Sequence, residues 1–346
     1  MSNHIKNVAI VGAGGQIGSH IVRALVAQGK HNITAITREG SENQIPDGVA
    51  RRTVNYENHA SLVSALEGND FLIVTLAVTA PVETSALLFK AAAEAKVPWV
   101  MPNLFGTDCS DPNAEEAIRM QFESQRSVLE GLGLSWVAIA CSFWYEFSLA
   151  GTSDRYGFDF RNKKVTFYDD GETPIHTTTF PQVGRAVASL LALAVAPTDP
   201  KDTSPTLATF RNKFVHIASF RISQKDMFAS VLRVTKTQES DWDISYENSK
   251  DRFDRAKAAM LSGDRIAFGR MLYARGFFPG DTNMCNFDRY GLDNKLLGLP
   301  EESLDEFTQV AVDMVNENYI EKKYAALQNA GGNRVAMALY GEKQSE

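Results

Sequence analysis

The chain has 346 residues and a hydrophobic share of 44%, which is enough for a sizeable core and well above the composition of disordered proteins. Its 42 acidic residues outnumber its 35 lysines and arginines, so the formal net charge is −7, and there is no long basic run. A nucleic-acid partner is therefore not expected, because phosphate binding needs clustered positive charge.

Strand and helix patterns alternate through the first half of the chain. Short apolar runs rich in β-branched residues are typical of buried parallel strands, and helical spacing of apolar side chains is typical of amphipathic helices. In chain order we expect strands at Asn7–Val11, Ile33–Thr37, Arg51–Val54, Phe71–Leu76, Trp99–Met101 and Trp136–Ala140, and helices at Gln16–Gln28, Ser61–Glu67, Val82–Ala95 and Glu115–Leu132. This alternation predicts an α/β fold of the Rossmann type, with a doubly wound parallel sheet covered by helices on both faces.

The alternation loosens after about residue 145, and we expect a smaller C-terminal α/β lobe there. This part is predicted to contain a hairpin or loop at Tyr156–Tyr168, helices at Gln182–Ala194, Ser223–Val234, 251–276 and 303–325, and a strand at Phe214–Ala218. The predicted division places a Rossmann domain in residues 1–150 and a substrate lobe in residues 151–346. Some segments of the second part are expected to return to the Rossmann sheet.

The cysteines and the apolar runs indicate the cellular compartment and whether a segment could enter a membrane. Cys109, Cys141 and Cys285 are odd in number and far apart, so they predict neither a disulfide framework nor a zinc site. The apolar run Val8–Val11 is too short for a signal peptide, and the longest one, Ala186–Ala196, is about half a membrane span. We therefore expect a cytoplasmic protein with no metal and no membrane partner.

A glycine-rich turn follows the first expected strand and opens the first expected helix. Gly12, Gly15 and Gly18 give a G-x-x-G-x-x-G spacing. In dinucleotide-binding folds the first glycine permits the tight turn, the second lets the backbone approach the pyrophosphate, and the third lets helix and strand pack closely. The free N–H groups and the positive dipole end of the helix then face the phosphates. The strand, the turn and the helix together predict a nicotinamide dinucleotide site.

The end of the second expected strand bears on which dinucleotide is bound. A carboxylate there would hold the ribose hydroxyls of NAD, whereas an arginine accommodates the 2′-phosphate of NADP. The strand ends in Thr37-Arg38, and Arg38 is placed to pair with a phosphate as a bidentate donor. Glu39 follows, but one residue later its side chain is expected to point elsewhere. The sequence therefore favours NADP(H) over NAD.

Several segments resemble the NmrA-like and isoflavone reductase-like group of atypical short-chain dehydrogenases. They are Val8–Leu25, Thr37-Arg38, Ser61–Leu76, Trp99–Asp108, Ser142–Leu149 and Gly291–Phe307, of which the last is similar to fungal members. The resemblance covers most of the chain and implies an NADP-binding Rossmann domain with a small substrate lobe. It also implies the cofactor contacts: Gly12, Gly15, Gln16, Ile17 and Gly18 at the pyrophosphate, Arg38 at the 2′-phosphate, Asn55 near the adenine, Thr75, Leu76 and Ala77 at the middle of the cofactor, and Pro102, Asn103 and Phe105 at the nicotinamide.

The chain departs from this group in the residues that supply a proton. Asn103 and Leu104 replace the usual serine and glutamate. Reductases of the group carry a lysine on the helix before the sixth strand, but residues 97–162 contain no lysine. The Tyr-x-x-x-Lys pair of ordinary short-chain dehydrogenases is missing as well, because Leu149 stands four residues after Tyr145.

The proton must therefore come from another group, since the cofactor supplies only the hydride. Tyr145 follows the sixth expected strand, where a substrate pocket should open, and His176 lies in a β-like segment and could donate a proton near neutral pH. Tyr156 is a third candidate. Two of the candidates have a structural alternative: an aromatic wall for Tyr145 and a hydrogen-bonded core histidine for His176. The aromatic residues from Phe143 to Tyr168 indicate either a pocket for a planar substrate or ordinary core packing.

Two functions remain open at this point. The first is an NADPH-dependent reductase of a small aromatic or secondary-metabolite substrate, which the aromatic content and the reductase side of the group favour. The second is a non-catalytic NADP(H)-binding redox sensor that regulates a partner protein, which the NmrA side of the group and the missing lysine favour. We expect the reductase, and we expect a small-molecule partner with a homodimer as one oligomeric state to test.

Overall fold

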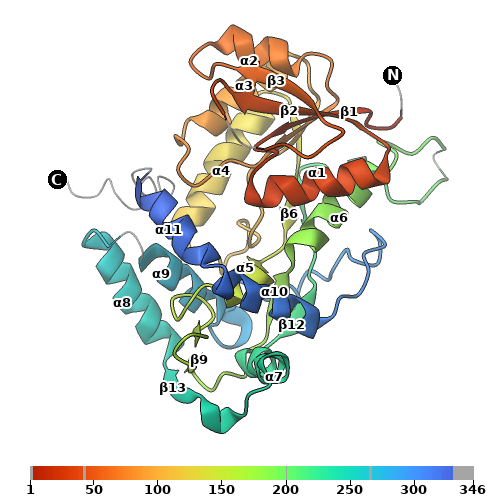
Figure 1. Cartoon of the computed structure of the whole chain (residues 1–346). Coiled ribbons are helices and arrows are strands. Elements are labelled where there is room, and N and C mark those ends of the chain that lie inside the picture. Colours follow the sequence, from red (N-terminus) through yellow and green to blue (C-terminus); the bar gives the residue numbers. More distant parts are fainter. Residues whose placement is uncertain (1–2, 42–43, 200, 265–266, 330–346) are drawn as a thin grey trace.

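The central feature of the molecule is a parallel sheet of seven strands in the order β11-β6-β5-β4-β1-β2-β3 (Figure 1). The computed structural model describes residues 3–41, 44–199, 201–264 and 267–329. The strands are β1 Asn7–Val11, β2 Asn32–Arg38, β3 Ala50–Val54, β4 Phe71–Val74, β5 Trp99–Met101, β6 Ser135–Ala140 and β11 Lys213–His216. The strand order reverses between β1 and β4, which is the switch point where ligands of such sheets bind. The predicted α/β fold of the Rossmann type is confirmed.

Helices cover both faces of this sheet (Figure 1). One layer is formed by α1 Gln16–Gln28 and α6 Phe180–Leu191, and the other by α2 His59–Leu66, α3 Thr84–Glu94 and α4 Glu116–Gly131. Successive residues of a strand point to opposite faces. Ile10 of β1 therefore belongs to the core beneath α1 and α6, and Val11 to the core beneath the other three helices.

Two small sheets and a third core make up the rest of the chain. One sheet contains β7 Phe143–Trp144, β10 Ile175–Thr178 and β12 Phe220–Ile222, and the other contains β8 Phe158–Asp159, β9 Lys164–Tyr168 and β13 Asp243–Glu247. The helices are α5 Tyr145–Leu149, α7 Gln224–Thr235, α8 Ser249–Leu261, α9 Ala267–Gly276, α10 Leu304–Asn316 and α11 Tyr319–Asn329, with 3₁₀ turns at Leu207–Phe210, Glu239–Asp241 and Gly280–Thr282. Within the described ranges, no helix is both long and apolar enough to cross a membrane.

The second half holds most of the differences from the expected elements. The expected strand at Phe214–Ala218 is β11, which lies beside β6 at the edge of the central sheet. The expected helix at 251–276 is instead two helices, because α8 ends at Leu261 and Gly263 adopts a positive φ of +102°. The segment expected to form a hairpin or loop is an antiparallel hairpin of β8 and β9. The short strands β12 and β13 were not predicted, since both are partly exposed and carry little apolar periodicity.

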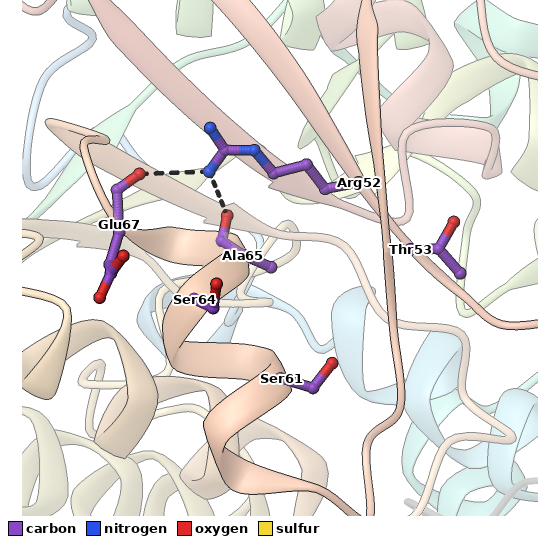
Figure 2. A pocket seen from close by; sticks show the side chains of 6 residues that line it. All are labelled: Arg52, Thr53, Ser61, Ser64, Ala65 and Glu67. Carbon is purple, nitrogen blue, oxygen red and sulfur yellow. Dashed lines mark hydrogen bonds between the residues drawn. The ribbon is translucent and has the colours of Figure 1, made fainter.

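A hollow of about 590 Å³ lies on the outer edge of the central sheet, between β3 and α2 (Figure 2). Arg52 reaches across it and donates to the carbonyl oxygens of Ala65 at 2.9 Å and Glu67 at 3.2 Å. These bonds satisfy carbonyl groups at the C-terminal end of α2, which have no partner within the helix. The hollow is lined by none of the residues expected in the functional site, and its arginine serves the fold.

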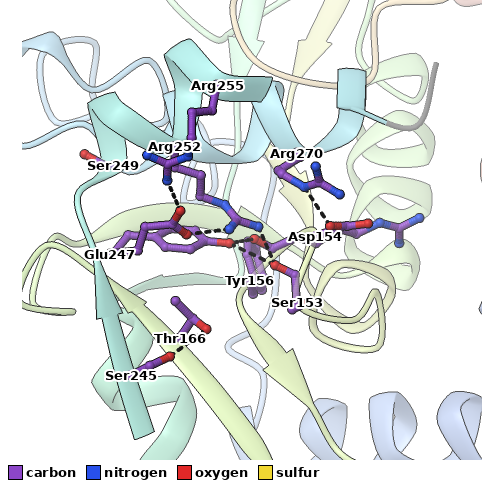
Figure 3. Close-up of polar contacts among 12 residues, drawn as sticks. Ser153, Asp154, Tyr156, Thr166, Ser245, Glu247, Ser249, Arg252, Arg255 and Arg270 are labelled. Carbon is purple, nitrogen blue, oxygen red and sulfur yellow. Dashed lines mark hydrogen bonds and ion pairs between the residues drawn. The ribbon is translucent and has the colours of Figure 1, made fainter. Parts of the chain in front are cut away.

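An ion pair joins β13 to α8, and a hydrogen bond from the same arginine reaches the loop before β8 (Figure 3). Arg252 is buried; it donates to the Glu247 carboxylate at 2.6 Å and to the carbonyl oxygen of Ser153 at 2.6 Å. Its guanidinium also lies 4.9 Å from the ring centre of Tyr168. Arg255 pairs with the same carboxylate, but its side chain is 62% exposed.

Replacing Arg252 with alanine is expected to lower the free energy of unfolding by about 2–3 kcal/mol, because the partly buried Glu247 carboxylate loses its buried partner and the Ser153 carbonyl oxygen loses one of its donors. Arg255→Ala removes the same charge from the exposed side of the same carboxylate and is expected to cost less than about 1 kcal/mol. Urea unfolding of the two variants measures the contrast. Equal losses of unfolding free energy in the two variants would show that the buried pair stabilises the fold no more than the exposed one.

Candidate functional site

The glycine-rich turn lies at the switch point, between the end of β1 and the start of α1. Gly12 has a φ of +82°, and a Cβ on it would lie 2.1 Å from the carbonyl oxygen of Thr75. A Cβ on Gly18 would lie 2.1 Å from the carbonyl oxygen of Gly12. The Thr75 hydroxyl, at the end of β4, donates to the carbonyl oxygen of Val11 at 2.8 Å. Only glycine allows the turn, the helix and the neighbouring strand to approach this closely.

Helix α1 begins without a side-chain cap. Its N-cap residue is Gly15, whose N–H donates to the carbonyl oxygen of Gly12 at 2.8 Å. In the part of the chain that the structure describes, the N–H groups of Gln16, Ile17 and Gly18 have no acceptor. The side-chain Nε2 of Gln16 is buried and also has no partner there. These free donors and the positive end of the helix dipole together form a site for an anion.

Arg38 and Asn55 lie further along the same sheet edge. Arg38 ends β2 with an exposed side chain and forms no ion pair with any described residue. Burial raises the pKa of Tyr56, and the positive charge of Arg38 partly opposes that rise, so the two groups are near each other. The Asn55 side chain accepts from the N–H of Glu57 at 2.9 Å, and its backbone N–H donates to the Ser61 hydroxyl at 3.2 Å. Arg38 is therefore available to an anion, while Asn55 shapes the turn that follows β3.

The segments after β4 and β5 are tied to each other. The Asn103 side-chain amide donates to the carbonyl oxygen of Leu76 at 3.1 Å. Pro102 and Phe105 are buried, and Phe105 packs in the core beneath α1 and α6, while Ala77 is exposed. The expected cofactor residues thus lie along one edge of the sheet, at the carboxyl ends of β1, β2, β3, β4 and β5.

The tyrosines proposed as proton donors lie inside the third core. Tyr145 is fully buried, with its hydroxyl 2.7 Å from the Thr308 hydroxyl, and burial raises its pKa well above the ordinary value. Tyr156 is also fully buried, with its hydroxyl 2.9 Å from the Thr177 hydroxyl. Both hydroxyls are paired away from solvent. The geometry therefore favours the structural alternative for both.

His176 is likewise enclosed. Its Nδ1 accepts from the N–H of Phe287 at 2.9 Å, and its ring stacks on that of Phe287 at 5.4 Å. Its Nε2 lies 3.6 Å from the Asp288 carboxylate. Burial lowers the pKa of this imidazole. Both ring nitrogens thus hold the chain around residues 285–288 in place, which again favours the structural alternative.

A histidine that was not among the candidate proton donors forms a buried pair with an acid. His216 ends β11, and its Nε2 lies 2.9 Å from Oδ2 of Asp108. The other carboxylate oxygen of Asp108 accepts from the N–H of Ser110 at 2.8 Å and from its hydroxyl at 2.6 Å. Burial raises the pKa of Asp108, but the bonds from His216 and Ser110 outweigh it and hold the pKa below its ordinary value. No sequence pattern joins the two residues, which are 108 positions apart.

A second hollow, of about 380 Å³, is lined in part by the two residues that follow Asp108 in the chain. Its lining includes Cys109 and Ser110 from the segment after β5, and Arg119, Met120 and Glu123 from the first turns of α4. Nε of Arg119 is buried and has no partner in the described part of the chain. Among described residues, no three or more His, Cys, Asp or Glu side chains gather as a metal site would require.

Comparison with known proteins agrees with the resemblance seen in the sequence. Residues 4–154 match the model of the NmrA-like family, so the predicted resemblance is confirmed there. The oxidoreductase aprR of Aspergillus flavus is 27% identical over 311 residues, which are 86% of this chain and 96% of that protein. An isoflavone reductase structure superposes with a TM-score of 0.68 at 21% identity and covers 89% of this chain and 99% of its own. The structure of leucoanthocyanidin reductase from Vitis vinifera with NADPH superposes with a TM-score of 0.67 at 16% identity. The match covers 88% of this chain and 99% of that chain.

Proposed function

We propose that this chain, which is NmrA-like over residues 4–154, is an NADP(H)-dependent reductase of a small-molecule substrate. The observation that carries the proposal is the glycine cradle at the switch point. A Cβ on Gly12 or Gly18 would fill it, and the buried amide of Gln16 lacks a partner among the described residues. These features fit a pyrophosphate seated at the start of α1.

Each part of the sheet edge has a defined task in this proposal. The free N–H groups of α1 bind the pyrophosphate, and Arg38 pairs with the 2′-phosphate. Asn103, by bonding to the carbonyl oxygen of Leu76, fixes the two segments that border the nicotinamide. Bound NADPH supplies a hydride to an electrophilic carbon of the substrate. A solved relative is described as a complex with NADPH, which supports this choice of cofactor.

The names of the solved relatives bear on the substrate class. Solved relatives are named isoflavone reductase and pinoresinol-lariciresinol reductase. We therefore propose a small aromatic carbonyl compound or enone as the substrate. A cytoplasmic location and a homodimer remain expectations of the sequence.

The redox-sensor alternative has one observation in its favour. Tyr145 and His176, the donors expected from the sequence, are both buried and paired, and the group's lysine is absent. The experiment that separates the two functions is NADPH oxidation by the purified chain with a panel of aromatic aldehydes, ketones and enones. Turnover supports the reductase. Its absence across the panel, together with unequal affinities for NADPH and NADP⁺, would support the sensor.

The cofactor itself is tested by thermal unfolding. NADPH is expected to raise the melting temperature more than NADH does at equal concentration, because tighter binding to the native state gives greater stabilisation. Arg38→Ala is expected to weaken NADPH binding about ten- to a hundredfold, the loss of a charge-assisted phosphate contact, and to leave NADH binding unchanged. Arg255→Ala, which removes an exposed arginine of α8, is the control. Equal shifts by the two cofactors in the wild-type chain would remove Arg38 from the site.

A further inference from the structure

We propose that His216, oriented by Asp108, donates the proton in this reductase reaction. The inference rests on the proposed function and supplies the group that the sequence lacks. Its support is the position of the pair on the sheet, the hydrogen bonds that fix the residue, and the ring nitrogen Nδ1, which has no partner among the described residues.

The pair lies at the carboxyl edge of the sheet, level with the segment expected to border the nicotinamide. Gly106, the last residue of that segment, bridges to Ala140 of β6, and Ala140 is in register with His216 of β11. The three residues thus form one row across neighbouring strands. Two strand spacings separate the backbones of Gly106 and His216 by about 10 Å. The imidazole of His216 contacts Asp108, which lies two residues after Gly106, so the ring is directed toward the segment after β5.

The surroundings fix the imidazole from several sides. The His216 ring stacks on the ring of Tyr290, with 4.5 Å between the ring centres and an angle of 12° between the planes. The ring of Phe287 packs edge to face, with 5.2 Å between the ring centres. Its backbone N–H donates to the Asp293 carboxylate at 2.9 Å. A ring held this firmly keeps one orientation and one tautomer, with Nε2–H donated to Asp108. Such an arrangement of carboxylate and imidazole stabilises the protonated imidazolium that a proton donor needs.

The remaining nitrogen, Nδ1, distinguishes His216 from the other buried histidine of this region. At His176 both ring nitrogens face protein groups. At His216, Nδ1 has no partner within the described ranges, and the side chain is 11% exposed. In this proposal the exposed part of the ring is where a substrate atom reaches Nδ1.

Other titratable and charged groups surround the pair. The nearby carboxylates lie in two segments: Asp108 and Asp111 in the loop after β5, and Asp293 near the end of the turn after Phe287. Arg289 lies 3.4 Å from Asp111 and offsets one of them. His176 is the other titratable group close enough to interact, and the phenol of Tyr290, whose pKa burial and nearby Asp111 raise, stays neutral.

The proposed reaction is the reduction of a carbonyl group to an alcohol. The carbonyl carbon gains a hydride from NADPH, which becomes NADP⁺, and the π-electron pair moves to the oxygen. That oxygen takes the proton from Nδ1 of His216, and the imidazole regains a proton from water. Asp108 does not contact the substrate and acts by positioning the ring.

The test begins with the aromatic carbonyl that the wild-type chain reduces fastest. His216→Asn is expected to lower kcat by about 10²–10⁴-fold, the usual contribution of a general acid. KM and the affinity for NADPH should change less than about twofold, and added imidazole should restore part of the activity. Asp108→Asn should lower kcat less. The control is His59→Asn, which breaks a pair of similar length, 2.8 Å to Glu94, at the surface of α2.

A second readout does not depend on turnover. Nitrogen NMR of the wild-type chain should show the His216 imidazole in the Nε2–H tautomer, and Asp108→Asn should convert it to a mixture. Binding of NADP⁺ with the product alcohol should shift the His216 signals and leave those of His59 unchanged. Full activity of folded His216→Asn, or His216 signals indifferent to the alcohol, would overturn the proposal. No turnover by the wild-type chain on any carbonyl would instead count against the reductase function itself.

Discussion

Replacing Gly18 with alanine is expected to weaken NADPH binding by at least about tenfold and to lower the free energy of unfolding by about 1–3 kcal/mol. The added Cβ would lie 2.1 Å from the carbonyl oxygen of Gly12 and 2.8 Å from the Thr75 hydroxyl. The shorter contact is with backbone at the junction between β1 and β4, and backbone cannot rotate aside as a side chain can. The start of α1 must therefore shift away from β1, and its free N–H groups lose their alignment on the pyrophosphate.

Gly131→Ala is the matched control for this substitution. Gly131 is the last residue of α4, and no atom lies within 4 Å of a Cβ built on it. Alanine there should raise the free energy of unfolding by up to about 1 kcal/mol, since it loses less backbone entropy on folding than glycine. Urea unfolding and fluorescence titration with NADPH measure both variants. Wild-type affinity in Gly18→Ala would mean that the dinucleotide is not seated at this turn.

The first half of the fold could be predicted because its signals are local. The run Asn7–Val11 and the helix Gln16–Gln28 are found with the expected bounds. A buried strand, a glycine-rich turn and an amphipathic helix can each be recognised from the pattern of a few neighbouring residues. The residues expected to hold a cofactor therefore fall on one edge of the sheet, as parallel strands require.

The pair of Asp108 and His216 could not be predicted in the same way. It exists because β11, drawn from the second half of the chain, adds to the sheet beside β6. A lone histidine at the end of an apolar run has no spacing that reveals its partner. The same reasoning explains Tyr145: its place after β6 suggested a pocket, but the partner that encloses it, Thr308, lies 163 residues away.

A buried carboxyl group of α5, which contacts the first residue of α6, makes the stability of the chain depend on pH. Glu146 follows Tyr145 in α5; it is 2% exposed, and one of its oxygens accepts from the N–H of Phe180 at 2.9 Å. The other oxygen is buried with no partner among the described residues. Burial, with a smaller contribution from the like charge of Glu302, raises the pKa of Glu146 to about 7.

The sign of the effect follows from the two pKa values. Below the ordinary value of 4.5 the carboxyl is protonated in both states, and between there and about 7 only the folded chain keeps the proton. The stability that the protonated group contributes is therefore present at low pH and is lost as the pH rises through about 7. At about 1.4 kcal/mol per unit, the loss amounts to about 3 kcal/mol.

Glu146→Gln keeps an acceptor for the N–H of Phe180 and removes the ionisation. We expect the variant and the wild-type chain to have similar free energies of unfolding near pH 5, and the variant to be the more stable by about 3 kcal/mol at pH 8. Urea unfolding at the two pH values gives this double difference, in which all other titrating groups cancel. Glu301→Gln, at an exposed position, should follow the wild-type curve. If the gap between Glu146→Gln and the wild-type chain is the same at both pH values, then Glu146 is not the group that keeps its proton in the folded state.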